Sequence, residues 1–155
     1  MALFESIPQV AILGARGIGQ VHARLFQKSG ANICAILGSS MRTAQQTAEL
    51  LHKSIGISPK PFDKLESLIK ETQPDALSIC TPAEFHFEQI LTAFDQGLAV
   101  FCEKPLFWKK NLNPDLLEAQ INLLNEHQDR CLFLNTCNAY FMESVLEKTG
   151  KPSII

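Results

Sequence analysis

The sequence predicts an α/β protein built on a doubly wound parallel sheet of about six strands, with helices on both faces. Three observations predict this fold class. Short apolar runs alternate with segments of helical spacing, only a few residues join each run to the next segment, and a glycine-rich turn follows the first run. Because parallel strands are joined by right-handed crossovers, this alternation narrows the topology to a doubly wound sheet.

The expected strands are apolar runs that are short enough to be buried on both faces of a sheet. The first run meets glycine directly, at Gly14. The third run contains Pro61, which cannot donate a ladder hydrogen bond, so this run is at most a short edge strand. The six runs are residues 9–13, 32–37, 60–62, 76–80, 98–102 and 130–135.

The segments between these runs have the apolar spacing of helices. In the first of them, Val21, Leu25 and Phe26 share one face. Asp63 is suited to cap the third helix, with Glu66 as its capping-box partner. The expected helices are residues 19–29, 43–52, 64–71, 85–96, 113–125 and 140–148.

The turn after the first strand carries the strongest local signal. Glycine there allows a tight turn, a close approach of the backbone to a pyrophosphate, and close packing of helix on strand. The phosphates then lie at the positive end of the helix. Gly14 and Gly19 match the outer glycines of G-x-G-x-x-G, whereas Arg16 holds the middle position and either reaches a phosphate or points to solvent. Because the turn lies in the first strand–helix unit, it predicts a Rossmann NAD(P)-binding fold rather than an ordinary turn. The cofactor-binding residues expected here are Gly14, Ala15, Arg16, Gly17, Ile18 and Gly19.

The end of the second strand favours NADP over NAD as the cofactor. Domains that prefer NAD usually place Asp or Glu about 20 residues beyond the glycines, where the carboxylate binds the ribose 2′-hydroxyl. Here the stretch from 37 to 42 has no acid and instead holds Ser39, Ser40 and Arg42, whose hydroxyls and guanidinium suit a 2′-phosphate. The alternative is that the serines only form the turn before the helix and that Arg42 is a surface residue.

Two further motifs follow the fourth and fifth strands, at the sheet edge where the glycine turn also lies. With them the chain resembles the N-terminal half of the glucose–fructose oxidoreductase and inositol dehydrogenase (Gfo/Idh/MocA) family, which includes many sugar dehydrogenases. The resemblance covers residues 8 to 110 well and the remainder loosely. The residues that carry it are the glycine turn with Val21-His22-Ala23, the segment Ser78-Ile79-Cys80-Thr81-Pro82 with His86, and Glu103-Lys104-Pro105-Leu106.

The resemblance implies roles for the residues after the fourth strand. Thr81 and Pro82 would flank the nicotinamide, and His86 would lie near its ribose. The alternative is that His86, in the first turn of a helix, is only a surface or capping residue. His22, in the middle of the first helix, is expected to be a packed or solvated histidine rather than a ligand.

The resemblance also implies roles for the residues after the fifth strand. Glu103 would orient Lys104, and Pro105, as a cis proline, would fix the turn. Lys104 would contact the nicotinamide ribose and the substrate hydroxyl, where an ammonium stabilises a developing alkoxide and passes on a proton while the cofactor carries the hydride. The rival interpretation is that Glu103 and Lys104 form an exposed ion pair worth under ~1 kcal/mol.

The family continues after its Rossmann half into a second α/β domain that supplies the substrate pocket and much of the oligomer interface. We therefore expect residues 1–150 to form the dinucleotide-binding domain and 151–155 to begin a substrate domain that this sequence lacks. The chain would then be part of an NAD(P)-dependent dehydrogenase acting on the CH–OH group of a sugar, a cyclitol or a similar compound, with homo-oligomers as a further expectation. The alternative is a short, non-catalytic NAD(P)-binding sensor or partner module. About 180 further codons in frame would support the dehydrogenase, and a stop codon directly after Ile155 would reject it.

Composition excludes several other classes of function. A net charge of −2 argues against nucleic-acid binding, which depends on clustered Lys and Arg. No apolar run approaches the roughly 20 residues of a membrane span, and the N-terminus lacks the pattern of a signal peptide, so we expect a cytoplasmic protein. The five cysteines form no C-x-x-C pair, and with the four histidines they show no metal-ligand spacing.

Overall fold

The computed structural model describes residues 6–14 and 16–136. Its core is a six-stranded sheet in which each pair of neighbouring strands is parallel, in the order β3-β2-β1-β4-β5-β6. This is the strand order of a Rossmann fold, and it confirms the predicted fold class. The strands are β1 (Gln9–Leu13), β2 (Asn32–Leu37), β3 (Lys60–Phe62), β4 (Ala76–Ile79), β5 (Ala99–Glu103) and β6 (Leu132–Asn135).

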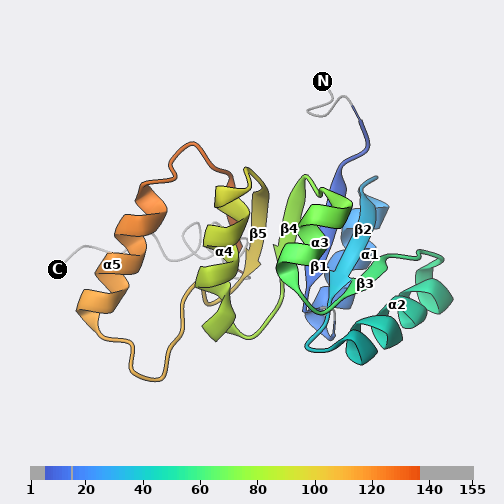
Figure 1. Cartoon of the computed structure of the whole chain (residues 1–155), viewed down its shortest axis with the longest axis horizontal. Coiled ribbons are helices and arrows are strands. Elements are labelled where there is room, and N and C mark those ends of the chain that lie inside the picture. The colour runs from blue at the N-terminus through green and yellow to red at the C-terminus, as the bar shows by residue number, and fades with distance from the viewer. Residues whose placement is uncertain (1–5, 15, 137–155) are drawn as a thin grey trace, which may run out of the picture.

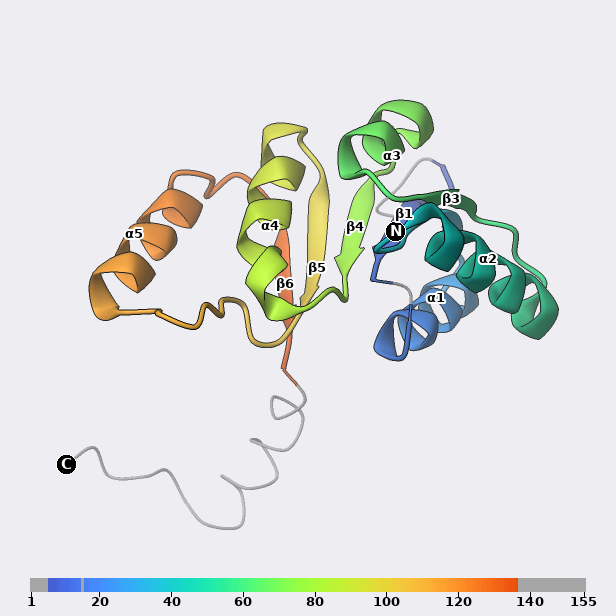
Figure 2. The ribbon, with the colours of Figure 1, turned by 60° about the horizontal axis from the view of Figure 1, so that its bottom comes forward.

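Helices cover the sheet on both faces (Figure 1). Val10 and Ile12 of β1 pack in one apolar cluster with residues of α1 and α2, while Ala11 and Leu13 pack in a second cluster with residues of α3 and α4. Figure 2 shows the two pairs of helices on opposite sides of the sheet. Because both faces are covered, the central strands are apolar throughout instead of alternating. The helices are α1 (Ile18–Lys28), α2 (Met41–Ile55), α3 (Leu65–Thr72), the short 3₁₀ helix η1 (Ala83–Phe85), α4 (His86–Asp95) and α5 (Pro114–Asn125).

The buried face of α1 differs from the one that the apolar spacing predicted. Val21 and Leu25 are 45% and 57% exposed, so their placement on the core face was wrong. Gly19, His22 and Ala23 are buried instead. The cause is the close approach of α1 to the sheet: a Cβ on Gly19 would lie 2.4 Å from the backbone oxygen of the preceding turn. Once Gly19 faces the sheet, residues three and four positions further along face it too.

The start of α3 also differs from the prediction. Asp63 does not cap this helix; Lys64 takes the N-cap position with an extended backbone, and no side chain caps the first turn. Leu68 and Ile69 of this helix are buried in the core. The helix thus begins without the roughly 1 kcal/mol that an aspartate N-cap would contribute.

The remaining boundaries are close to the predictions. The fourth helical segment opens with η1, and α4 itself begins at His86. The helix expected at 140–148 lies outside the described residues, as does the boundary at residue 150. Within the described part of the chain, no helix has the length and apolarity that a membrane crossing requires.

Candidate functional site

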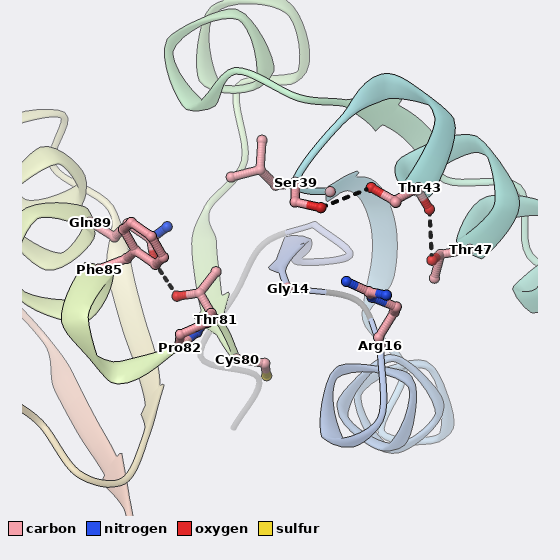
Figure 3. Close-up of a pocket in the computed structure, with 12 residues that line it drawn as sticks. Gly14, Arg16, Ser39, Thr43, Thr47, Cys80, Thr81, Pro82, Phe85 and Gln89 are labelled. Atoms are coloured by element: carbon pink, nitrogen blue, oxygen red, sulfur yellow. Dashed lines mark hydrogen bonds between the residues drawn. The ribbon is translucent and has the colours of Figure 1, made fainter.

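A cavity of about 450 Å³ opens at the carboxyl ends of β1, β2 and β4 (Figure 3). This is the point at which the strand order reverses between β1 and β4, where open α/β sheets bind their ligands. The lining residues come from the glycine turn, the end of β2, the first turns of α2 and the segment from the end of β4 to α4. They are Gly14, Arg16, Leu37, Gly38, Ser39, Thr43, Thr47, Cys80, Thr81, Pro82, Phe85 and Gln89.

The three described glycines of the first turn have different structural roles. Gly14 has a positive φ of 79°, and a Cβ there would lie 2.6 Å from the backbone oxygen of Cys80. Gly14 and Gly19 therefore allow the strand ends and the helix to approach closely. Gly17, with φ 55°, is the N-cap of α1; a Cβ on it would meet nothing within 4 Å. The first turn of α1 has no side-chain cap and no acidic residue, so the helix presents its positive end beside the cavity.

The other residues predicted in the turn differ in whether they line the cavity. Arg16, at the irregular middle position, is exposed and lines the cavity, and Figure 3 draws it between Gly14 and Thr47. Ile18 is 45% exposed and does not line the cavity. Ala15 lies outside the described residues.

Hydroxyl groups surround the cavity at the end of β2. Ser39 Oγ lies 3.4 Å from Thr43 Oγ1, and the Thr47 hydroxyl donates to the Thr43 carbonyl oxygen at 2.9 Å. Ser40 is instead the N-cap of α2, where its hydroxyl accepts a hydrogen bond from the backbone N–H of Thr43. Arg42 is exposed and is not among the lining residues. Of the lining residues that the structure describes, all are uncharged except Arg16, and none is a carboxylate.

The segment after β4 forms the opposite wall. The Thr81 hydroxyl donates to Gln89 Oε1 at 2.6 Å, and Pro82 and Phe85 lie beside it (Figure 3). Burial raises the pKa of the Cys80 thiol to about 12. This cysteine therefore remains a neutral thiol at physiological pH and is not a nucleophile there.

His86 joins the segments after β4 and β5 from behind the cavity. Its side chain is 1% exposed, so the interpretation as a surface residue is wrong. Nε2 lies 2.7 Å from the Thr81 carbonyl oxygen, and Nδ1 lies 2.9 Å from the Pro105 carbonyl oxygen. His86 itself does not line the cavity. It connects the segment after β4, which lines the cavity, to the segment after β5, which does not.

The segment after β5 places its two charged residues in different surroundings. Glu103 is buried, and its Oε1 contacts His22 Nε2 at 2.8 Å and Asn135 Nδ2 at 2.6 Å. Lys104 is exposed, and the peptide bond from Lys104 to Pro105 is cis. The ion pairs of the described residues do not include one between Glu103 and Lys104, so the interpretation as an exposed ion pair is wrong. None of these residues lines the cavity itself.

Sequence reasoning missed several lining residues. Thr43 and Thr47 lie one helical turn apart on α2, and Phe85 and Gln89 have the same spacing across the start of α4. A signal was available in both pairs, because residues four apart in a helix share a face. In these two helices the sequence pointed instead to Arg42 and His86, which lie in the first turns but do not line the cavity.

Known proteins are similar to this chain in sequence. A model of the oxidoreductase family with an NAD-binding Rossmann fold (GFO_IDH_MocA) matches residues 9–135. D-glucoside 3-dehydrogenase of Escherichia coli (strain K12) is 31% identical over 106 residues, which cover 67% of this chain and 29% of that protein. Inositol 2-dehydrogenase of Paracoccus denitrificans (strain Pd 1222) is 29% identical over 100 residues, covering 63% of this chain and 29% of that protein. The matched part thus spans less than a third of these curated relatives.

Solved structures share the fold. The myo-inositol 2-dehydrogenase from Lactobacillus plantarum aligns with a TM-score of 0.72 at 22% identity, covering 97% of this chain and 44% of that one. The scyllo-inositol dehydrogenase from Lactobacillus casei, solved with bound NAD(H) and scyllo-inositol, aligns with a TM-score of 0.72 at 19% identity, covering 92% and 42%.

Proposed function

The chain belongs to the oxidoreductase family with an NAD-binding Rossmann fold, and we propose that it is the cofactor-binding half of a dehydrogenase that transfers a hydride between a nicotinamide cofactor and a sugar or cyclitol hydroxyl. The substrate class is inferred from relatives whose names are inositol and glucoside dehydrogenases. The domain would extend to about residue 150, and a further domain would supply the substrate pocket.

One observation carries the proposal: the uncapped positive end of α1 lies beside a cavity at the switch point of the sheet. Gly17 has open space where a side chain would stand, so a phosphate can approach the backbone N–H groups there. Among the described residues that line the cavity, Arg16 adds the one charged side chain. These features fit the pyrophosphate of a dinucleotide, whose negative charge they would balance.

For the adenosine end, we propose a preference for NADP over NAD. The hydroxyls of Ser39 and Thr43 line the cavity where β2 ends, and the wall has no carboxylate to repel a 2′-phosphate. The cation that would face this phosphate is Arg16 rather than Arg42, since Arg42 does not line the cavity. The NADP preference thus depends on Arg16 in place of Arg42, and its physical reason is still the pairing of a guanidinium with the 2′-phosphate.

For the reaction end, the cofactor supplies the hydride chemistry when it is bound. Thr81 and Pro82 would flank the nicotinamide side of the cavity, and His86 would fix their segment relative to Pro105. Lys104, exposed just beyond β5, would hold a proton at Nζ and stabilise the alkoxide that develops on the substrate.

Calorimetric titration of the chain with NADPH and with NADH tests the cofactor site. We expect both to bind, with NADPH binding more tightly. Gly17→Ala should weaken both, because its Cβ would occupy the space of the phosphate. Gly56→Ala is the matched control: Gly56 also has a positive φ, of 73°, with open space around it, but it ends α2. Absence of binding by both cofactors would reject the proposed function, and equal or reversed affinities would reject only the NADP preference.

The role of Lys104 is tested separately. We expect Lys104→Ala to leave cofactor affinity nearly unchanged and to abolish turnover of the full-length protein with its substrate, screened among myo-inositol and methyl D-glucosides by the absorbance of reduced nicotinamide. Lys109→Ala, which also removes an exposed lysine from the same loop, should retain turnover. Retained turnover by Lys104→Ala would remove this residue from the reaction.

A further inference from the structure

His22 lies in an unusual environment for the middle of a helix. The residue is 4% exposed, and both ring nitrogens have partners: Nε2 lies 2.8 Å from Glu103 Oε1, and Nδ1 lies 2.8 Å from Ser78 Oγ. The edge of the ring packs against Phe101, with the ring centroids 5.1 Å apart. The imidazole is thus fixed in position and in orientation. Burial of so polar a group is costly unless its hydrogen bonds are made, and here they are.

The contact with Glu103 assigns the direction of one hydrogen bond. An ionised carboxylate can only accept, so His22 Nε2–H donates to Glu103 Oε1, as Asn135 Nδ2–H does at 2.6 Å. The partners lie 81 and 32 positions from Glu103 along the chain. Three elements, α1, β5 and β6, therefore meet at one carboxylate oxygen at the end of β5.

We propose that His22 is a positioning residue for Lys104, acting through Glu103. The bond holds Glu103, the last residue of β5, against α1, and it thereby fixes the backbone that leads directly into the exposed Lys104. The same helix begins at Gly17, the N-cap in the glycine turn. His22 therefore ties the helix that would hold the phosphates to the backbone that carries the proposed reactive lysine. This inference rests on the proposed function of Lys104.

A purely structural role for His22 makes a different prediction. If the network served stability alone, all substitutions of His22 would lower stability and none would selectively change the surroundings of Lys104. Two substitutions separate these roles. In His22→Gln, the amide nitrogen is as many bonds from Cβ as imidazole Nε2 is, so it can still donate to Glu103. In His22→Asn, the amide reaches only the Nδ1 position, so the contact with Ser78 can persist while that with Glu103 is lost.

The test is the NMR signal of Lys104 in the full chain after ¹³C-methylation of its lysines, assigned by its disappearance in Lys104→Arg. The spectrum is recorded with and without saturating NADPH, and urea midpoints monitor the fold. We expect NADPH to shift the Lys104 signal in the wild type and in His22→Gln, and we expect the shift to be lost in His22→Asn while the NADPH affinity is kept.

The outcomes separate the inference from the function on which it depends. A Lys104 signal that ignores bound NADPH in the wild type would overturn the proposed place of Lys104, and the inference with it. A normal shift in the wild type and an equal shift in His22→Asn would overturn the inference alone. Equal loss of the Lys104 shift in both His22 variants, with equally lowered urea midpoints, would also overturn the inference, because a purely structural role of His22 would then explain both the lost shifts and the lower stability.

Discussion

Gly14→Ala tests how closely β1 and β4 approach each other at the cavity. The backbone at Gly14 has φ 79°, and a Cβ added there would lie 2.6 Å from the Cys80 oxygen and 2.7 Å from the Thr81 nitrogen. Both are backbone atoms of the segment that follows β4, so no side-chain rotation can relieve the overlap. The two strands would have to separate at the point where the cavity opens.

The magnitude follows from two separate terms. A left-handed backbone costs a residue with a Cβ about 1–2 kcal/mol, and forcing an added carbon into a packed site costs roughly a further 1–3 kcal/mol. Gly14→Ala should therefore lower the free energy of unfolding by about 2–5 kcal/mol. For Gly56→Ala only the backbone term applies, so the free energy of unfolding should fall by about 1–2 kcal/mol, because φ is 73° and nothing lies within 4 Å of the Cβ position.

Urea denaturation of the two variants isolates the overlap. With a slope of about 2 kcal/mol per molar urea, the midpoint of Gly14→Ala should lie about 0.5–1.5 M below that of Gly56→Ala. Gly14→Ala should also lose NADPH affinity, whereas Gly56→Ala should keep it. Equal midpoints for the two variants would refute the close approach of the strands, because the second term would then be absent.

Two further predictions concern stability. Burial raises the pKa of Cys102 to about 12 from the ordinary value of 9.0. Between these two pH values the unfolded chain loses a proton that the folded chain keeps. The contribution of Cys102 to the free energy of unfolding is therefore fully present below pH 9 and should fall by about 1.4 kcal/mol per pH unit above it. Cys102→Ala should reduce this slope in pH-dependent urea titrations and leave the part due to Cys80, and an unchanged slope would contradict the burial argument. Ser40→Ala should cost about 1 kcal/mol in the same assay, because the N-cap bond of α2 is lost, while NADPH affinity is retained. A loss of affinity in Ser40→Ala would mean that Ser40, and not only Ser39, contacts the cofactor.

The parts of the site that depend on local sequence were predictable. The glycine turn follows a strand directly, and Gly14 lies where the chain has to turn, so its place at the cavity can be inferred from the order of elements alone. The same holds for the segment after β4, because parallel strands bring their carboxyl ends to one edge, whereas the residues after β5 lie at that edge without lining the cavity. The roles of Ser40 and Arg42 were not predictable, since the choice between helix cap and cavity wall depends on the rotation of α2 about its axis.

The partners of Glu103 show why the other parts were missed and how they could be found. The expected partner was the adjacent Lys104, but the lysine is exposed, and the buried carboxylate instead contacts His22 and Asn135, which are distant in sequence. The apolar pattern of α1 placed Val21, Leu25 and Phe26 on one face and left open whether His22 is packed or solvated. The glycine at position 19 supports the opposite rotation, because a glycine needed for close helix packing must face the sheet, and a histidine three positions later shares its face. In α1 the steric requirement of Gly19 and the apolar pattern predict different orientations of the helix, and the helix adopts the one that Gly19 requires. The reason is that exposing a valine costs less free energy than placing a Cβ 2.4 Å from a backbone oxygen.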